Sequence, residues 1–180
     1  MFMKVLNKNN RALKKGFTLI EMVLALAIMA IMCTYVVSTF KVVNYSHLKV
    51  VTVNNMHDYA SLNLQAAQNV IQNAKSISKS SGKIIGIAGG NDNYVCYGST
   101  STKLLPGLTQ YHTGSGKAKW RLEMEVKTDK ASKTVTITLK MYDNAIPSSD
   151  ITYSDVMVVY CPGVTDDNFE EFTSNAIYVS

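Results

Sequence analysis

The sequence predicts an α+β fold, in which a long N-terminal helix crosses a membrane with its first half and carries an antiparallel β-sheet on its second half. Three observations support this prediction. Residues 17–81 contain neither Gly nor Pro, so no helix breaker interrupts them. The first part of that stretch is apolar all round, whereas the second is apolar on one face. From residue 120 onward, apolar residues recur at every second position, which is typical of half-buried strands.

The first sixteen residues form a basic flank in front of the apolar stretch. Five of the chain's 18 Lys and Arg residues lie within the first fifteen positions, and none of its 13 Asp and Glu residues does. The net charge of +5 is therefore an N-terminal feature, and the rest of the chain is close to neutral. A positive flank before an apolar segment stays in the cytoplasm. Residues 1–16 are thus predicted to be a cytoplasmic leader and the body to be exported.

Residues 17–40 are predicted to be a single membrane-spanning helix. They contain one charge, Glu21, and no Lys or Arg. A helix of this length rises about 36 Å, which is enough to cross a hydrocarbon core of about 30 Å. A secretory signal peptide is the rival interpretation, but its apolar region has about 7–15 residues and ends at a small-residue cleavage site. This run is longer and leads into KVVNYSHLKV, which has no such site.

Residues 41–81 are predicted to form the amphipathic half of the same helix, which we expect to end near Lys79 at the SSG sequence of Ser80–Gly82. Apolar residues follow steps of three and four and make one stripe. The polar positions between them are rich in Asn and Gln, so only the stripe can be covered by a folded domain. The stripe consists of Val53, Met56, Ala60, Leu64, Ala67, Ile71, Ala74 and Ile77.

Residues 82–180 are predicted to be a loop-rich segment followed by an antiparallel sheet. The Gly-rich first part has one short strand at Tyr94–Tyr97. Two alternating runs, KWRLEMEVKT and KTVTITLKMYD, are joined by a polar turn around Asp129–Ser132, as in a pair of half-buried strands. A sheet with one apolar face needs a cover, and the stripe on the helix provides it. Further strands are expected at Asp155–Cys161 and Ala176–Val179.

Two of the three cysteines lie in the exported body. Cys33 lies within the apolar run and is interpreted as a small apolar side chain. Cys96 and Cys161 lie 65 residues apart, in or beside short apolar strands. An exported domain faces an oxidising compartment, in which a disulfide persists. A Cys96–Cys161 disulfide is therefore expected, and two buried thiols are the alternative.

The junction KKGFTLIEMVLALAIM resembles the N-terminal signature of type IV pilins and of the related pseudopilins of type II secretion and competence systems. The matching residues are Lys14 to Glu21, followed by the apolar run. The resemblance implies that a prepilin peptidase cuts on the cytoplasmic side after Gly16 and methylates the new N-terminal residue, Phe17. It also implies a pilin-like fold with one helical spine and a strand-rich body.

Glu21 is the unusual residue of the apolar run. A charged side chain within a membrane segment costs about 2.5–3.5 kcal/mol on insertion scales, so such residues usually have a partner. The resemblance implies that this partner is the free amine of Phe17 on an adjacent subunit, and cleavage would create that amine. The alternative is a carboxylate that snorkels to water near the cytoplasmic interface.

The resemblance implies a structural protein and not an enzyme, with no cofactor and no catalytic residues. Its implied partners are the prepilin peptidase, sibling pilins, an assembly platform protein and a motor ATPase. The implied location is the cell membrane, with a cytoplasmic N-terminus, and then an extracellular or envelope-spanning filament. Two alternatives remain open. One is a minor or tip pilin that binds DNA, a surface or a secreted cargo, and the other is an uncleaved single-pass protein with a signal anchor.

Other candidate sites are weak. The three histidines have no metal-ligand spacing, and the Gly-rich segments GIAGGNDN and TGSGK lack the order of a phosphate-binding loop. An acidic cluster near residue 168 is interpreted as a solvated loop, with calcium binding as the alternative. Basic residues around Trp120 suggest DNA contact, but a polar strand face is favoured. These two clusters contain Asp166, Asp167, Glu170 and Glu171, and Lys117, Lys119 and Arg121.

Overall fold

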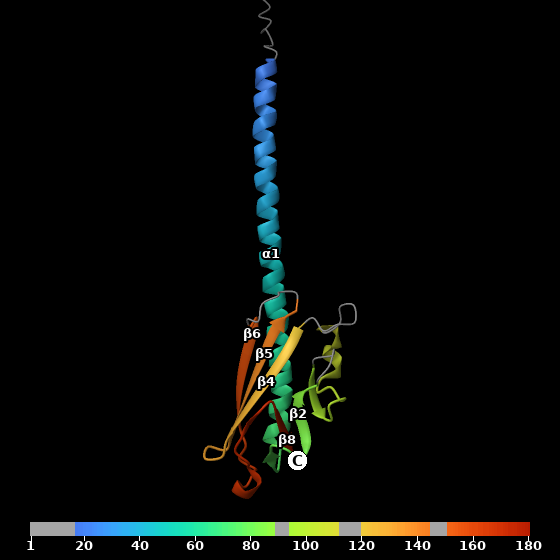
Figure 1. Ribbon diagram of the computed structural model, residues 1–180, viewed down its shortest axis with the longest axis vertical. Coiled ribbons are helices and arrows are strands. Elements are labelled where there is room, and N and C mark those ends of the chain that lie inside the picture. Colours follow the sequence, from blue (N-terminus) through green and yellow to red (C-terminus); the bar gives the residue numbers. More distant parts are fainter. Residues whose placement is uncertain (1–16, 89–93, 112–119, 145–150) are drawn as a thin grey trace, which may run out of the picture. The chain divides into compact units, whose positions relative to one another are not determined.

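The computed structural model describes residues 17–88, 94–111, 120–144 and 151–180. The chain divides into two compact units, Met1–His47 and Leu48–Ser180. One helix, α1 (Leu19–Gln72), contributes to both (Figure 1). The fold class is α+β, as the sequence predicts, and all the described strands lie in the second unit.

The described part of the first unit consists of the start of α1. Every side chain from residue 17 to residue 51 is exposed. Leu24, Leu26 and Ile31, for example, are 62%, 63% and 69% exposed. An apolar helix without a cover in its own chain needs an apolar environment or a partner.

The second unit covers one face of the later part of α1. The buried residues follow the predicted stripe from Met56 to Ile71, both of which are fully buried. Tyr59 and Asn63 also lie on this face, and the Asn63 side-chain amide donates to the Tyr59 carbonyl at 2.8 Å. The Tyr59 ring meets the Trp120 ring edge to face, with centroids 5.8 Å apart.

Two four-stranded antiparallel sheets complete the second unit (Figure 1). The first has the strand order β1-β8-β2-β3 and the second has the order β6-β5-β4-β7. Two short 3-10 helices, η1 (Pro106–Tyr111) and η2 (Asp166–Asn168), lie in the connections. The strands are β1 (Ile77–Ser78), β2 (Lys83–Ile87), β3 (Val95–Gly98), β4 (Trp120–Asp129), β5 (Thr134–Asp143), β6 (Tyr153–Tyr160), β7 (Thr173–Ser174) and β8 (Ala176–Val179).

The β4–β5 hairpin is the most regular part of the second sheet. Its ten residue pairs run from Trp120 opposite Asp143 to Asp129 opposite Thr134. Burial alternates strictly along β4, because successive side chains of a strand point to opposite faces. In the turn, the Asp129 carboxylate accepts from the Ser132 hydroxyl at 2.9 Å and from the Ala131 N–H at 2.9 Å. These hydrogen bonds lower the Asp129 pKa and fix the predicted turn.

The inner faces of both sheets and the stripe of α1 share one core. Ile85 and Ile177 of the first sheet and Val126, Ile137 and Met141 of the second are fully buried in it. β4 lies next to β2 and β8, which joins the sheets along their middle strands. The predicted packing of an apolar sheet face on the amphipathic half of the helix is confirmed.

The end of α1 differs from the prediction. The helix ends at Gln72, not near Lys79, and Ile77 pairs with Val179 in the first sheet. Ile77 is 1% exposed, so its place in the sheet buries the side chain, as the predicted helical stripe would also have done. Serines also favour turns over helix interiors, because their hydroxyls compete for backbone groups. Ser78, for example, donates to the Ser81 carbonyl at 2.7 Å.

The segment expected to be loop-rich also contains an unpredicted strand. β2 pairs with β3 on one side and with β8 on the other. Its sequence, KIIGI, is short and lacks the alternation that identifies the later strands. The Gly at position 86 places its backbone close to Ala176, since a Cβ built there would lie 3.0 Å from the Ala176 Cβ. The result is two sheets, where one was predicted.

Candidate functional site

The start of α1 contains the predicted processing and assembly residues. Gly16 lies outside the described residues. Phe17 precedes the helix and is 83% exposed, and Glu21 lies in the first helical turn. The structure therefore places Phe17 and Glu21 at one helix end, on a surface that nothing in the described chain covers.

Glu21 forms a capping box with Thr18. Its Oε2 atom accepts from the Thr18 N–H at 2.8 Å and from the Thr18 hydroxyl at 2.9 Å. In return, the Glu21 N–H donates to the Thr18 hydroxyl at 3.3 Å. Such reciprocal bonds satisfy backbone donors that a helix start leaves without partners. The carboxylate also lies at the positive end of the helix dipole.

Sequence reasoning missed this role, although the signal was present. The pattern T-x-x-E directly before an apolar run is the signature of a capping box, and it occurs at Thr18–Glu21. Both hydrogen bonds from Thr18 end on Oε2. Within the described residues no donor is bonded to Oε1, so Glu21 can cap its own helix and accept a further donor at the same time.

Further along the first unit, three hydroxyl side chains of α1 bond to the helix itself. The hydroxyls of Thr34, Ser38 and Thr39 donate to carbonyls three or four residues earlier, at 2.7, 2.9 and 3.0 Å. Hydroxyls satisfied in this way are tolerated in an apolar environment. The helix surface can therefore be surrounded by lipid or by other helices without leaving these groups unpaired.

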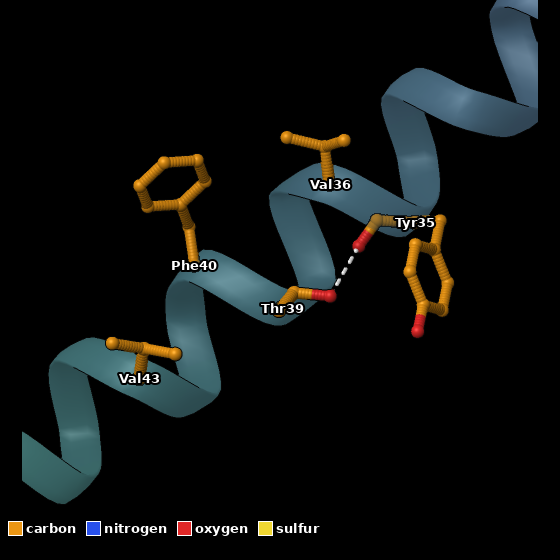
Figure 2. Close-up of a pocket in the computed structure, with 5 residues that line it drawn as sticks. All are labelled: Tyr35, Val36, Thr39, Phe40 and Val43. Carbon is orange, nitrogen blue, oxygen red and sulfur yellow. Dashed lines mark hydrogen bonds between the residues drawn. The ribbon is translucent and has the colours of Figure 1, made fainter.

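A shallow apolar groove lies on this part of α1 (Figure 2). Figure 2 shows the Phe40, Val36 and Val43 side chains along one side of the helix, and the Tyr35 side chain projecting beyond Thr39. No ionisable group other than the Tyr35 phenol lines the groove. Such a surface suits packing of an apolar side chain and offers no catalytic group.

α1 is the one helix in the described part of the chain that is long and apolar enough to cross a membrane. Length and composition alone support this, and a helix near the N-terminus passes the same test when it is a signal sequence. The prediction of a membrane-capable helix is confirmed in this sense. Its orientation in a membrane stays a prediction.

Two carboxylates of the acidic cluster bond to other parts of the fold. Asp166 forms an ion pair with Lys133 at 3.0 Å, and Glu170 Oε2 accepts from the Lys79 N–H at 2.7 Å. Among the residues that the structure describes, no group of three or more His, Cys, Asp or Glu side chains is arranged to hold a metal. His47 and His57 lie on α1, and His112 lies outside the described residues.

The basic cluster around Trp120 is described only at Trp120 and Arg121. Trp120 is 4% exposed and therefore does not offer its ring to a base. The Arg121 guanidinium lies 4.3 Å from the centroid of the Tyr142 ring and 3.5 Å from a Glu123 carboxylate oxygen. Lys117 and Lys119 lie outside the described residues, as does TGSGK. The favoured interpretation, a polar strand face, fits this geometry.

The expected Cys96–Cys161 disulfide is absent from the structure. Both residues are fully buried free thiols. Cys96 lies in β3 of the first sheet, whereas Cys161 follows β6 of the second. The Cys96 thiol donates to the Gly86 carbonyl at 3.3 Å. Burial raises the pKa of Cys96, and it raises that of Cys161 to about 11, so both are held as neutral thiols.

Comparison with known proteins identifies the helix start. Residues 11–37 match the family model of the prokaryotic N-terminal methylation motif. The matched segment contains Gly16, Phe17 and Glu21, and the motif indicates a pilin-like protein that is processed by prepilin cleavage. The match supports the type IV pilin and pseudopilin family. No curated protein and no solved structure matched the chain.

Proposed function

We propose that this chain is a structural subunit of a type IV pilus or of a related secretion or competence filament. In this proposal the prepilin peptidase cuts after Gly16 and methylates Phe17. An assembly platform protein and a motor ATPase then transfer the subunit from the membrane into a filament of sibling pilins. The observation that carries the proposal is the methylation motif at the start of a helix whose apolar surface is exposed from residue 17 to residue 51.

The charge of Glu21 gives the proposal a mechanism. An incoming subunit brings the amine of Phe17 into an apolar helix bundle, where an unpaired charge is costly. In the proposal, the amine binds the Glu21 carboxylate of a neighbouring copy while Oε2 still caps its own helix. One polar pair in an apolar bundle also fixes the axial register between helices.

The test compares two substitutions of Glu21. Glu21→Val removes both the cap and the charge, and we expect its share in sheared filaments to fall by about tenfold or more, the ratio that corresponds to about 1.4 kcal/mol. Glu21→Gln keeps an acceptor for Thr18, because Gln also serves in a capping box, but it lacks the charge. We expect Gln to lower incorporation as Val does.

The N-terminal residue and the incorporated share are both measured by mass spectrometry. Both variants should still show Phe17 as the first residue, since cleavage precedes assembly in the proposal. If Glu21→Gln enters filaments as the wild type does, the carboxylate acts as a cap and the pairing mechanism is wrong. If the wild-type chain retains residues 1–16 in the bulk of the population, the alternative of an uncleaved anchored protein is favoured instead.

A further inference from the structure

We propose that the free edge of β6 docks on a second copy of this chain, at the opposite end of its folded unit, where Lys103 and Tyr94 flank β3. This proposal rests on the assembly of copies proposed above. It assigns the surfaces through which the exported units of neighbouring copies meet.

β6 is an end strand with an apolar outer face. Among the described residues it pairs with β5 alone, and it is the last strand in the order β6-β5-β4-β7. Val156, Val158 and Tyr160 project from it and are 57%, 60% and 57% exposed. A long apolar edge strand invites pairing with another chain, so proteins usually cover or charge it. Its exposure therefore indicates a partner.

The backbone of β6 is also directed toward the free edge at alternate residues. The Cys161 N–H donates to the Lys133 carbonyl beside β5 at 2.9 Å. Because backbone groups alternate in direction along an antiparallel strand, those of Val158 and Tyr160 face away from β5. The Val156 N–H is capped by the Asp155 carboxylate at 2.9 Å. Asp155 is the single charged residue of β6. Its side chain alternates with those of Val156 and Val158 and therefore lies on the other face of the strand, but its bond to the Val156 N–H brings the carboxylate to this edge.

The opposite end of the second unit has the complementary charge. β3 is the last strand of the other sheet, and the two sheets adjoin where β4 meets β2 and β8. In Figure 1, β6 and the green-yellow segment near residue 100 lie on opposite sides of α1. Lys103 is the one charged residue between positions 94 and 111. Its ammonium lies 5.1 Å from the centroid of the Tyr94 ring.

The outer edge of β3 is already covered by its own chain, so contact there uses side chains. The Leu104 N–H donates to the Val95 carbonyl at 2.8 Å, and the Tyr97 N–H donates to the Thr102 carbonyl at 3.0 Å. Lys103 and Tyr94 are left half-exposed beside these bonds. An aromatic ring and one cation fit a strand edge that has valines and a tyrosine on one face and one carboxylate on the other.

The symmetry of a filament explains why β6 meets a different surface. Copies whose N-terminal helices run in one direction are related by rotation and translation, so their contacts join two different patches. Antiparallel pairing of β6 with β6 of another copy requires a two-fold axis and would end the assembly at a dimer. The β6 edge and the Lys103 surface lie at opposite ends of one unit, so their contact can repeat from copy to copy in an open assembly.

The test is zero-length carbodiimide cross-linking of the full-length chain in intact cells, followed by peptide mapping of species at twice the chain mass. We expect Asp155 of one copy to be joined to Lys103 of another. Asp155→Lys and Lys103→Asp should each abolish this link and lower the share of the chain in sheared filaments. The double variant should restore both, because the amine and the carboxylate exchange places. Lys127→Asp, on the exposed face of β4, is the matched control and should change neither.

The remaining outcomes overturn the assignment. The assignment is contradicted if the wild-type chain shows no link between copies, or a link to another lysine. It is also contradicted if the adducts contain only other proteins, or if the double variant stays deficient. Val158→Asn, which removes apolar surface and leaves both linking groups intact, should reduce the link severalfold; an unchanged yield contradicts a role for the β6 face. Links between copies without the chain in filaments would reject the filament role and retain the docking surface. Filaments that contain the chain but lack the link would retain the filament role and reject the docking surface.

Discussion

The two parts of α1 share a backbone conformation and differ in what surrounds them. Ile28 is 52% exposed in the first unit, whereas Ile71 of the same helix is fully buried in the second. The later part is covered by two sheets of its own chain. The earlier part has no cover in the described chain, and in the proposed function lipid or other subunits provide it. One helix therefore contributes to a folded core and also leaves an apolar surface outside that core, which the proposed assembly would use.

The largest expected effect comes from matched substitutions in the two parts of α1. Ile71→Ala should lower the free energy of unfolding of the second unit by about 2–5 kcal/mol, because it leaves a cavity in the core. Ile28→Ala should change it by less than about 0.5 kcal/mol. Urea unfolding of the full-length chain in detergent, followed through the fluorescence of the single tryptophan, Trp120, measures both. Equal effects would contradict the division into a self-covered part and an externally covered part.

A second, smaller effect concerns the turn by which the chain leaves β1 and enters β2. Gly82 has φ +126°, and a Cβ built there would lie 2.7 Å from the Val179 carbonyl oxygen. Gly82→Ala should therefore destabilise the second unit by about 1–3 kcal/mol. Gly107→Ala is the control, since its Cβ would meet no atom within 4 Å. If both variants unfold at the same urea concentration, the close approach at Gly82 is not a constraint.

The smallest effect depends on pH. Burial raises the pKa of Cys161 from its ordinary value of 9.0 to about 11, so between these values the unfolded chain loses a proton that the folded chain keeps. The free energy of unfolding should therefore fall as pH rises from 9 to 11, by about 1 kcal/mol per pH unit from this group. Cys161→Ala should flatten that part of the profile.

The same thiols provide a check on the absent disulfide. In the native chain, Cys96 and Cys161 should react slowly with an alkylating reagent, because both are buried and neutral. After denaturation without a reductant, both should be fully alkylated. Protection of the pair until a reductant is added would show that the chain forms the bridge that this structure lacks.

Much of the fold follows from local patterns. The alternating runs of β4 and β5 were located within a residue or two, since strand alternation in a half-buried sheet is set by the sequence itself. β2 was not predicted, and the end of α1 was predicted near Lys79 and not at Gln72. Ile77 satisfies a helical stripe and a strand equally well, and its pairing partner, Val179, lies about a hundred residues away in the sequence. Local periodicity contains no information on such a partner.

The sequence alone determined the character of the helix start. The order of the basic flank, Gly16, Phe17 and Glu21 before an apolar run is a local signal, and the methylation-motif match covers the same residues. Thr18 and Glu21 form a capping box that is also readable from their spacing. These features need no tertiary contact, because they depend on residues within one helical turn.

Only the tertiary structure decided how the second unit is arranged. The separation of Cys96 and Cys161 into different sheets, the exposed edge at Val158 and the position of Lys103 beside β3 all depend on strand order. Strand order is fixed by packing between residues far apart in the chain, for which several pairings satisfy the same alternation. One of these pairings is selected because it buries both inner sheet faces against the stripe of α1.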